Sequence, residues 1–200
     1  MNLQKSVWGL GLAAMLAGCG GGETAKSAPT ASGILVNGAG ATFHYPIYAK
    51  WFDEYHKLHP DVKMNYQSIG SGGGIRQLLA GTVDFGATDS PMADEQMKQA
   101  KSPVLHFPTV IGAVVAAYNV PGVMEEISFT GDALAGIFIG KVKKWNDPAL
   151  ARANPGLKLP ADDIVVVHRS DGSGTSFVLT DYLSKISAEW KSTVGTGTAL

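Results

Sequence analysis

Apolar residues recur with a helical spacing in four segments of the chain, and residues at their ends fit helix termini. The segments run from 45 to 58, from 75 to 79, from 130 to 139 and from 179 to 186. Pro46 is tolerated in the first turn of the first segment. Gly81 can close the second and Thr130 can cap the third. We therefore predict a helix in each segment.

Other apolar positions alternate with polar ones or form short continuous runs, which predicts strands. Ile34 to Val36 is a short candidate, and alternation covers 62–66 and 83–87. The runs at 110–117 and 164–167 are apolar on both faces, as in strands buried within a covered sheet. Strands alternating with helices predict an α/β fold with largely parallel sheets.

The amino-acid composition changes twice around residues 104 to 120, which predicts that the chain passes there from a first lobe into a second. We place the first lobe at 33–108 and the second at 109–200. Gly is the unusual residue, with 25 in 200, nearly twice the average of about 7%. The net charge of −1 gives no basic excess for binding nucleic acid or an anionic membrane surface.

The N-terminus carries an export signal. A short positive region at Lys5 precedes an apolar stretch, 7–16, that is too short to span a bilayer. Small residues then lead to Cys19, the single cysteine. This order predicts a signal peptide at 1–18, lipidation of Cys19 and a flexible tether at 19–32. The alternative is an ordinary secretory leader with a free cysteine.

Glycines and hydroxyl residues gather at three predicted junctions between strands and helices. These are Gly38–Phe43 with Thr42, Gly70–Gly74 with Ser71, and Asp171–Thr175 with Ser173. Helix starts expose N–H groups that attract anions, and glycine lets a ligand approach the backbone. Each hydroxyl can also be an ordinary helix cap. Together with Arg169, the three favour a shared anion site.

Other kinds of site fit the sequence less well. Gly136, Gly140 and Lys141 lack the spacing of a phosphate-binding P-loop. His168, Asp171 and Ser173 are the residue types of a catalytic triad but crowd one turn. We expect no metal and no cofactor, and read His56 and His59 as solvated.

Five segments together resemble a known family. "GAGATF", "YQSIGSGGG", "VDFGATDSPM", "GKVKKWNDPAL" and "HRSDGSGTSF" are similar, in order, to the phosphate-binding protein of bacterial high-affinity phosphate ABC transporters. The resemblance covers residues 37 to about 198. It implies a periplasmic-binding-protein fold of two lobes that closes on one phosphate. Family members continue past the last residues, so we expect this chain to lack the C-terminal part of the fold.

The resemblance also implies the residues that bind phosphate. From the first lobe it points to Thr42, Phe43, Ser71 and Asp89, and from the second to Arg169, Ser173, Gly174 and Thr175, with Asp171 holding the Arg169 fork. His44 stands where the family commonly has proline, and Gly72 stands where a small hydroxyl residue or alanine is usual.

The sequence thus predicts a monomeric receptor, not an enzyme, that delivers phosphate to an ABC permease outside the cytoplasm. Two alternatives stay open. One is a phosphoester hydrolase with Ser173 as nucleophile. The other is a receptor for a different tetrahedral oxyanion such as sulfate.

Overall fold

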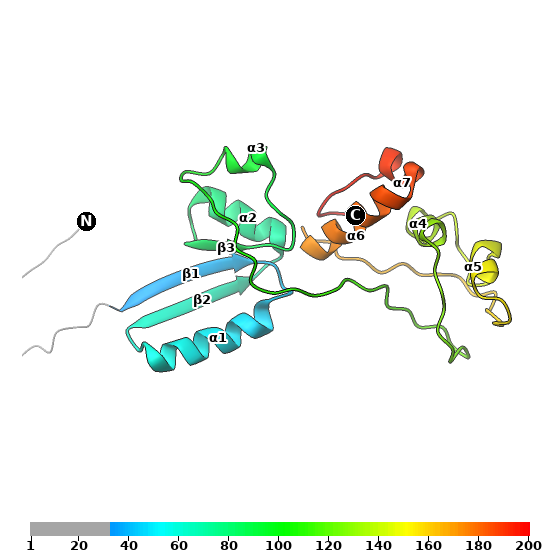
Figure 1. Ribbon diagram of the computed structural model, residues 1–200, viewed down its shortest axis with the longest axis horizontal. Coiled ribbons are helices and arrows are strands. Elements are labelled where there is room, and N and C mark those ends of the chain that lie inside the picture. The colour runs from blue at the N-terminus through cyan, green and yellow to red at the C-terminus, as the bar shows by residue number, and fades with distance from the viewer. Residues whose placement is uncertain (1–32) are drawn as a thin grey trace, which may run out of the picture. The chain divides into compact units, whose positions relative to one another are not determined.

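The computed structural model describes residues 33–200 and shows strands in the first half of this region and helices throughout. The elements in chain order (Figure 1) are β1 (Ile34–Gly40), α1 (Tyr45–Leu58), β2 (Val62–Ser68), α2 (Ser71–Ala80), β3 (Phe85–Ala87), α3 (Asp94–Met97), α4 (Gly131–Ile139), α5 (Pro148–Ala153), α6 (Gly174–Ile186) and α7 (Ala188–Thr193). The predicted signal peptide, Cys19 and the tether lie outside the described residues.

The strands form a parallel sheet, as the alternation of strands and helices predicts, and the order in this sheet is β2-β1-β3. Gly38 in β1 lies between Tyr66 of β2 and Phe85 of β3. The rings of these two neighbours stack with centroids 6.0 Å apart. A Cβ at Gly38 would lie 2.1 Å from the Phe85 ring, so a side chain there would displace it.

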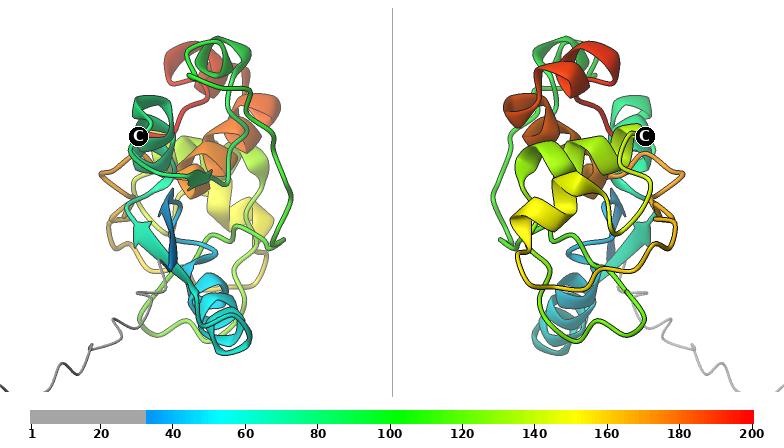
Figure 2. Two further views of the ribbon diagram at one scale, coloured as in Figure 1. Left: turned by 90° about the vertical axis from the view of Figure 1, so that its left-hand side faces the viewer. Right: turned by 90° about the vertical axis from the view of Figure 1, so that its right-hand side faces the viewer.

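The crossovers place α1 and α2 on opposite sides of the sheet (Figures 1 and 2). Tyr48 of α1 packs edge-on against Tyr66. On the other side, a Cβ on Gly74 of α2 would lie 2.5 Å from the carbonyl oxygen of the fully buried Ala39. This close approach brings the start of α2 to the carboxyl end of β1, where ligands bind in α/β sheets.

The residues that the sequence predicts at helix ends lie at helix ends in the structure. Pro46 lies in the first turn of α1, and Gly81 ends α2 in the left-handed conformation at φ 71°. Thr130 accepts a hydrogen bond from the Ala133 N–H at the start of α4. The predicted helices are therefore confirmed, and the strands predicted at 34–36, 62–66 and 83–87 are present with shifted ends.

Two apolar clusters hold the helices of the second half together. Ala133 and Leu150 belong to a cluster shared by α4 and α5. Ala135, Leu183 and Trp190 form a second cluster, in which α4 meets α6 and α7. Since α4 contributes to both, it is the central helix of this part.

Two predicted strands are wrong. Residues 110–117 are irregular and mostly exposed, with Ile111 97% and Val115 77% exposed. Residues 164–167 are also irregular, and Val165 and Val167 are more than 80% exposed. An apolar run indicates that its side chains favour burial against other residues. A strand also needs a neighbouring strand for its backbone hydrogen bonds. Within residues 33–200 neither run has one in a sheet.

Among the described residues, none of the helices has the length and apolar character needed to cross a membrane.

Candidate functional site

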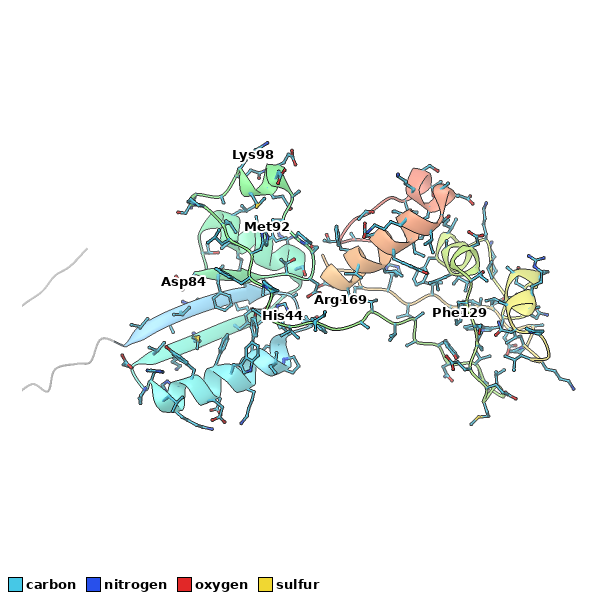
Figure 3. The ribbon with its side chains drawn as sticks, in the orientation of Figure 1. His44, Asp84, Met92, Lys98, Phe129 and Arg169 are labelled. Atoms are coloured by element: carbon cyan, nitrogen blue, oxygen red, sulfur yellow. The ribbon has the colours of Figure 1, made fainter. Side chains whose placement is uncertain are left out.

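The three glycine junctions come together in the structure. The Arg169 guanidinium donates from Nη1 to the Thr42 hydroxyl at 3.0 Å, which joins the residue just before the third junction to the first junction. The Gly72 N–H donates to the Gly172 carbonyl at 2.9 Å, which joins the second to the third. In Figure 3, His44 and Arg169 lie where β1 and β2 end and α6 begins. Segments distant in sequence therefore share one site.

The start of α6 lies against the start of α2. A Cβ on Gly174 would lie 2.4 Å from the Ser71 hydroxyl and 2.5 Å from the Asp89 Cβ. Both distances are shorter than real Cβ contacts, so only glycine fits between Ser71 and Asp89 without displacement. Gly174 thus sets how closely the two helix starts approach.

The serine at each of these two helix starts is buried. Ser71 and Ser173 are 0% and 1% exposed. Ser173 caps α6 by accepting from the Ser176 N–H at 3.3 Å, and Ser71 accepts from the Asp89 N–H at 3.3 Å. A helix start leaves N–H groups without intrahelical acceptors. At α6, Ser173 satisfies one of these groups, and those of Gly174 and Thr175 precede it.

Arg169 is held by Asp171. Its Nε donates to one carboxylate oxygen of Asp171 at 2.6 Å and its Nη2 to the other, so the fork is bidentate. The hydrogen bond raises the pKa of Arg169 and lowers the pKa of Asp171, so both stay charged. Because Nε and Nη2 are engaged, the guanidinium reaches Thr42 with Nη1.

Asp89 supplies a second, more buried carboxylate. Its side chain is 14% exposed, and its Oδ1 is buried without a hydrogen-bond partner among the described residues. Burial raises the pKa of Asp89, against the opposing effects of His44, Arg169 and a hydrogen bond from Thr175. A Cβ on Gly174 would lie 2.7 Å from Oδ2, so this oxygen faces the start of α6.

His44 is a site residue that the sequence reasoning left without a partner. Its side chain is buried, and its Nδ1 lies 3.7 Å from Asp89 Oδ1. Burial lowers the pKa of His44, and the Asp89 charge opposes this shift. The signal in the sequence was its place between the "GAGATF" turn and the first helix. Only the fold brings Asp89, which follows β3, beside it.

Phe43 and Thr175 are the more exposed members of the predicted set. Phe43 is 45% exposed in the turn before α1, and its ring lies against Gly112. Thr175 is exposed in the first turn of α6. All predicted ligand residues thus lie at or beside the three junctions, together with one arginine and two carboxylates.

The triad residue types do not form a triad here. The exposed His168 donates from Nδ1 to the Arg169 carbonyl at 3.0 Å, whereas Ser173 caps α6 and Asp171 holds Arg169. Across residues 33–200, no group of three or more His, Cys, Asp or Glu is arranged to hold a metal ion. His56 and His59 are exposed, as predicted.

The chain is similar to curated phosphate-binding proteins. It is 53% identical over 169 residues to the phosphate-binding protein PstS of Pasteurella multocida (strain Pm70), covering 84% of this chain and 48% of that protein. It is 52% identical over 175 residues to the phosphate-binding protein PstS of Haemophilus influenzae, covering 87% and 52%. The chain thus spans about half the length of these curated relatives.

A solved structure shares the fold. The crystal structure of a putative phosphate ABC transporter substrate-binding protein with bound phosphate from Clostridium perfringens aligns with a TM-score of 0.53 and 21% identity. The alignment covers 81% of this chain and 60% of that chain. The family model described as a PBP superfamily domain matches residues 23–198. With its parallel α/β sheet and this match over most of its length, the chain belongs to the PBP superfamily.

Proposed function

We propose that this protein is an extracytoplasmic receptor that captures inorganic phosphate and delivers it to an ABC permease. The observation that carries the proposal is the pairing of one arginine with one buried carboxylate at the glycine junctions. Arg169 attracts an oxyanion, while Asp89 can only accept a hydrogen bond and so selects a ligand that carries a proton. Phosphate near neutral pH is such a ligand. The relatives named phosphate-binding proteins support the same choice.

The proposed contacts follow from the geometry of the junctions. The Arg169 guanidinium and the hydroxyls of Thr42, Ser71, Ser173 and Thr175 would donate to phosphate oxygens. The backbone N–H groups of Phe43, Gly174 and Thr175 would add donors oriented by the local turns and by α6. Asp171 would keep the Arg169 fork in place, as it does here.

The net charge near the site leaves little unbalanced attraction. Asp89 and Asp171 together outweigh the single positive charge of Arg169. Binding would therefore depend mainly on oriented dipoles and hydrogen bonds. Sulfate, which has no proton at neutral pH, would place a negative oxygen against the Asp89 carboxylate. This repulsion would reject sulfate in favour of phosphate.

We also propose where the protein is anchored and how its lobes are divided. Cys19 would be lipidated and hold the protein on the extracytoplasmic, periplasmic side of a bacterial membrane through the 19–32 tether. Residues 33–108 and 109–200 would belong to two lobes that close on the ligand. We propose a monomeric receptor without catalytic activity.

Calorimetric titration with phosphate and with sulfate tests the proposal, alongside a hydrolysis assay with a generic phosphate ester. We expect saturable binding of one phosphate, much weaker binding of sulfate and no turnover. Turnover that depends on Ser173 would instead support a hydrolase, and tighter binding of sulfate would overturn the choice of ligand.

A further inference from the structure

His44 has a side-chain arrangement that a structural role in α1 does not explain. It occupies the N-cap position of α1, where Ser, Thr, Asp or Asn commonly accepts a hydrogen bond from the first turn. The His44 side chain makes no such cap. It turns instead toward Asp89, and its Nδ1 lies 3.7 Å from the buried Oδ1.

The two carboxylate oxygens of Asp89 face different surroundings. Oδ1 faces His44 and is the oxygen without a hydrogen-bond partner among the described residues. Oδ2 faces Gly174 at the start of α6, where the proposed ligand would bind. His44 therefore lies at Oδ1, whereas the proposed ligand would meet Oδ2.

The other ring nitrogen of His44 also faces an acceptor. Its Nε2 lies 3.5 Å from the Tyr66 hydroxyl, and that hydroxyl donates its proton to the Ala41 carbonyl at 2.7 Å. The hydroxyl can then only accept from His44. Both ring nitrogens face acceptors, an arrangement that suits the doubly protonated, cationic ring.

The other groups around the ring leave Asp89 as its charged partner. Tyr48 of α1 packs with its ring centroid 4.7 Å from that of His44. Burial raises the pKa of Tyr66 of β2, so its hydroxyl is neutral near pH 7. Arg169 acts on Asp89 from the side of α6. His44 and Asp89 thus form a pair whose charge depends on pH.

We propose that His44 is a positioning residue for the ligand's proton acceptor: its protonated ring holds Oδ1 of Asp89 and supplies a positive charge beside the site. The inference rests on the proposed function. It leaves Oδ2 of Asp89 as the oxygen that accepts the proton of phosphate. It also adds a second cation to a site in which two carboxylates outweigh Arg169.

The sign of the pH dependence follows from linkage. Burial lowers the pKa of His44 in the free protein, and a bound anion would raise it. The gain in phosphate affinity is then complete below the pKa of the free protein. It disappears as pH rises through the pKa of the complex. A change of one pKa unit between the two states corresponds to a factor of about ten in affinity.

The test compares the full chain with its His44→Gln variant, which keeps a polar side chain but has no titrating charge. Phosphate affinity is measured by calorimetry from pH 5 to pH 8.5, and the ratio between the proteins cancels the titration of phosphate itself. We expect the advantage of the wild type to be largest at pH 5, approaching about tenfold for a pKa change of one unit, and to fall within about twofold at pH 8.5. The exposed His59→Gln is the matched control and should show no difference. A ratio that stays constant with pH would overturn the proposal.

A second measurement needs neither phosphate nor the His44→Gln variant. The pKa of His44 is read from its ring resonances by NMR in the wild type and in Asp89→Asn. Removal of the carboxylate charge should lower this pKa by about one unit or more. An unchanged pKa overturns the pairing of His44 with Asp89. If the wild type binds no phosphate, the proposed function fails, and this measurement alone still decides the pairing.

Discussion

The substitution Asp89→Asn separates the shape of the site from its charge. Asn has nearly the same size as Asp, so the contacts of this side chain with Gly174 and Ser71 can stay. The amide removes one negative charge and adds two N–H donors. Phosphate, which can both donate and accept, should still bind. Sulfate, which can only accept, should bind better.

The repulsion between sulfate and the Asp89 carboxylate can be estimated from the burial of Asp89. Two unit charges about 4 Å apart repel by roughly 4 kcal/mol at an effective dielectric constant of about 20. The side chain is 14% exposed, so water reaches only a small part of it. Some of the repulsion is lost to relaxation and to the nearby Arg169. We therefore expect sulfate to gain at least about tenfold relative to phosphate, or ~1.4 kcal/mol.

The assay is competition of sulfate against labelled phosphate on both proteins at one pH and one salt concentration. Asp61→Asn is a suitable control, because Asp61 is exposed and precedes β2, at the opposite end of the sheet from the site. The control should leave the ratio of affinities unchanged. If Asp89→Asn also leaves it unchanged, Asp89 is not what distinguishes the two anions.

Three further substitutions test the fit of Gly174, the role of the Arg169 fork and the lipidation of Cys19. Gly174→Ala should weaken phosphate binding at least about tenfold in calorimetry, because the new Cβ would collide with Ser71 and Asp89. Gly197→Ala, whose Cβ would meet only an ordinary contact at 3.8 Å, should bind normally, and equal affinities would contradict this reasoning. Arg169→Lys should also cost at least about tenfold in calorimetric affinity, since an ammonium cannot reproduce the fork. Cys19→Ala should move the protein from the membrane fraction to the soluble fraction, and unchanged partition would refute lipidation at this residue.

The local structure of this chain could be predicted from its sequence to a large extent. Apolar spacing predicts α1, α4 and α6 within a few residues, together with Pro46 in the first turn of α1 and the caps Thr130 and Ser173 of the other two helices. These signals are short-range, because the two partners of each capping interaction lie within a few residues of each other along the chain. The runs at 110–117 and 164–167 failed for the opposite reason, because a strand depends on a neighbour that may lie anywhere in the chain.

The candidate site likewise has features that the sequence could predict and contacts that it could not. Glycine and hydroxyl residues marked the three junctions, and the resemblance added Asp89. The contact of His44 with Asp89 could not be predicted, because it depends on how α1 and the end of β3 meet. The same holds for Gly174 between Ser71 and Asp89, which becomes visible only when α6 and α2 are placed together.

Backbone NMR during a phosphate titration shows directly whether the three separate junctions form one phosphate site. The N–H resonances of Phe43, Ser71, Gly174 and Thr175 come from all three junctions. We expect these resonances to shift together, along one saturation curve with a single dissociation constant. Resonances that stay fixed, or that follow curves with different dissociation constants, would contradict a shared site.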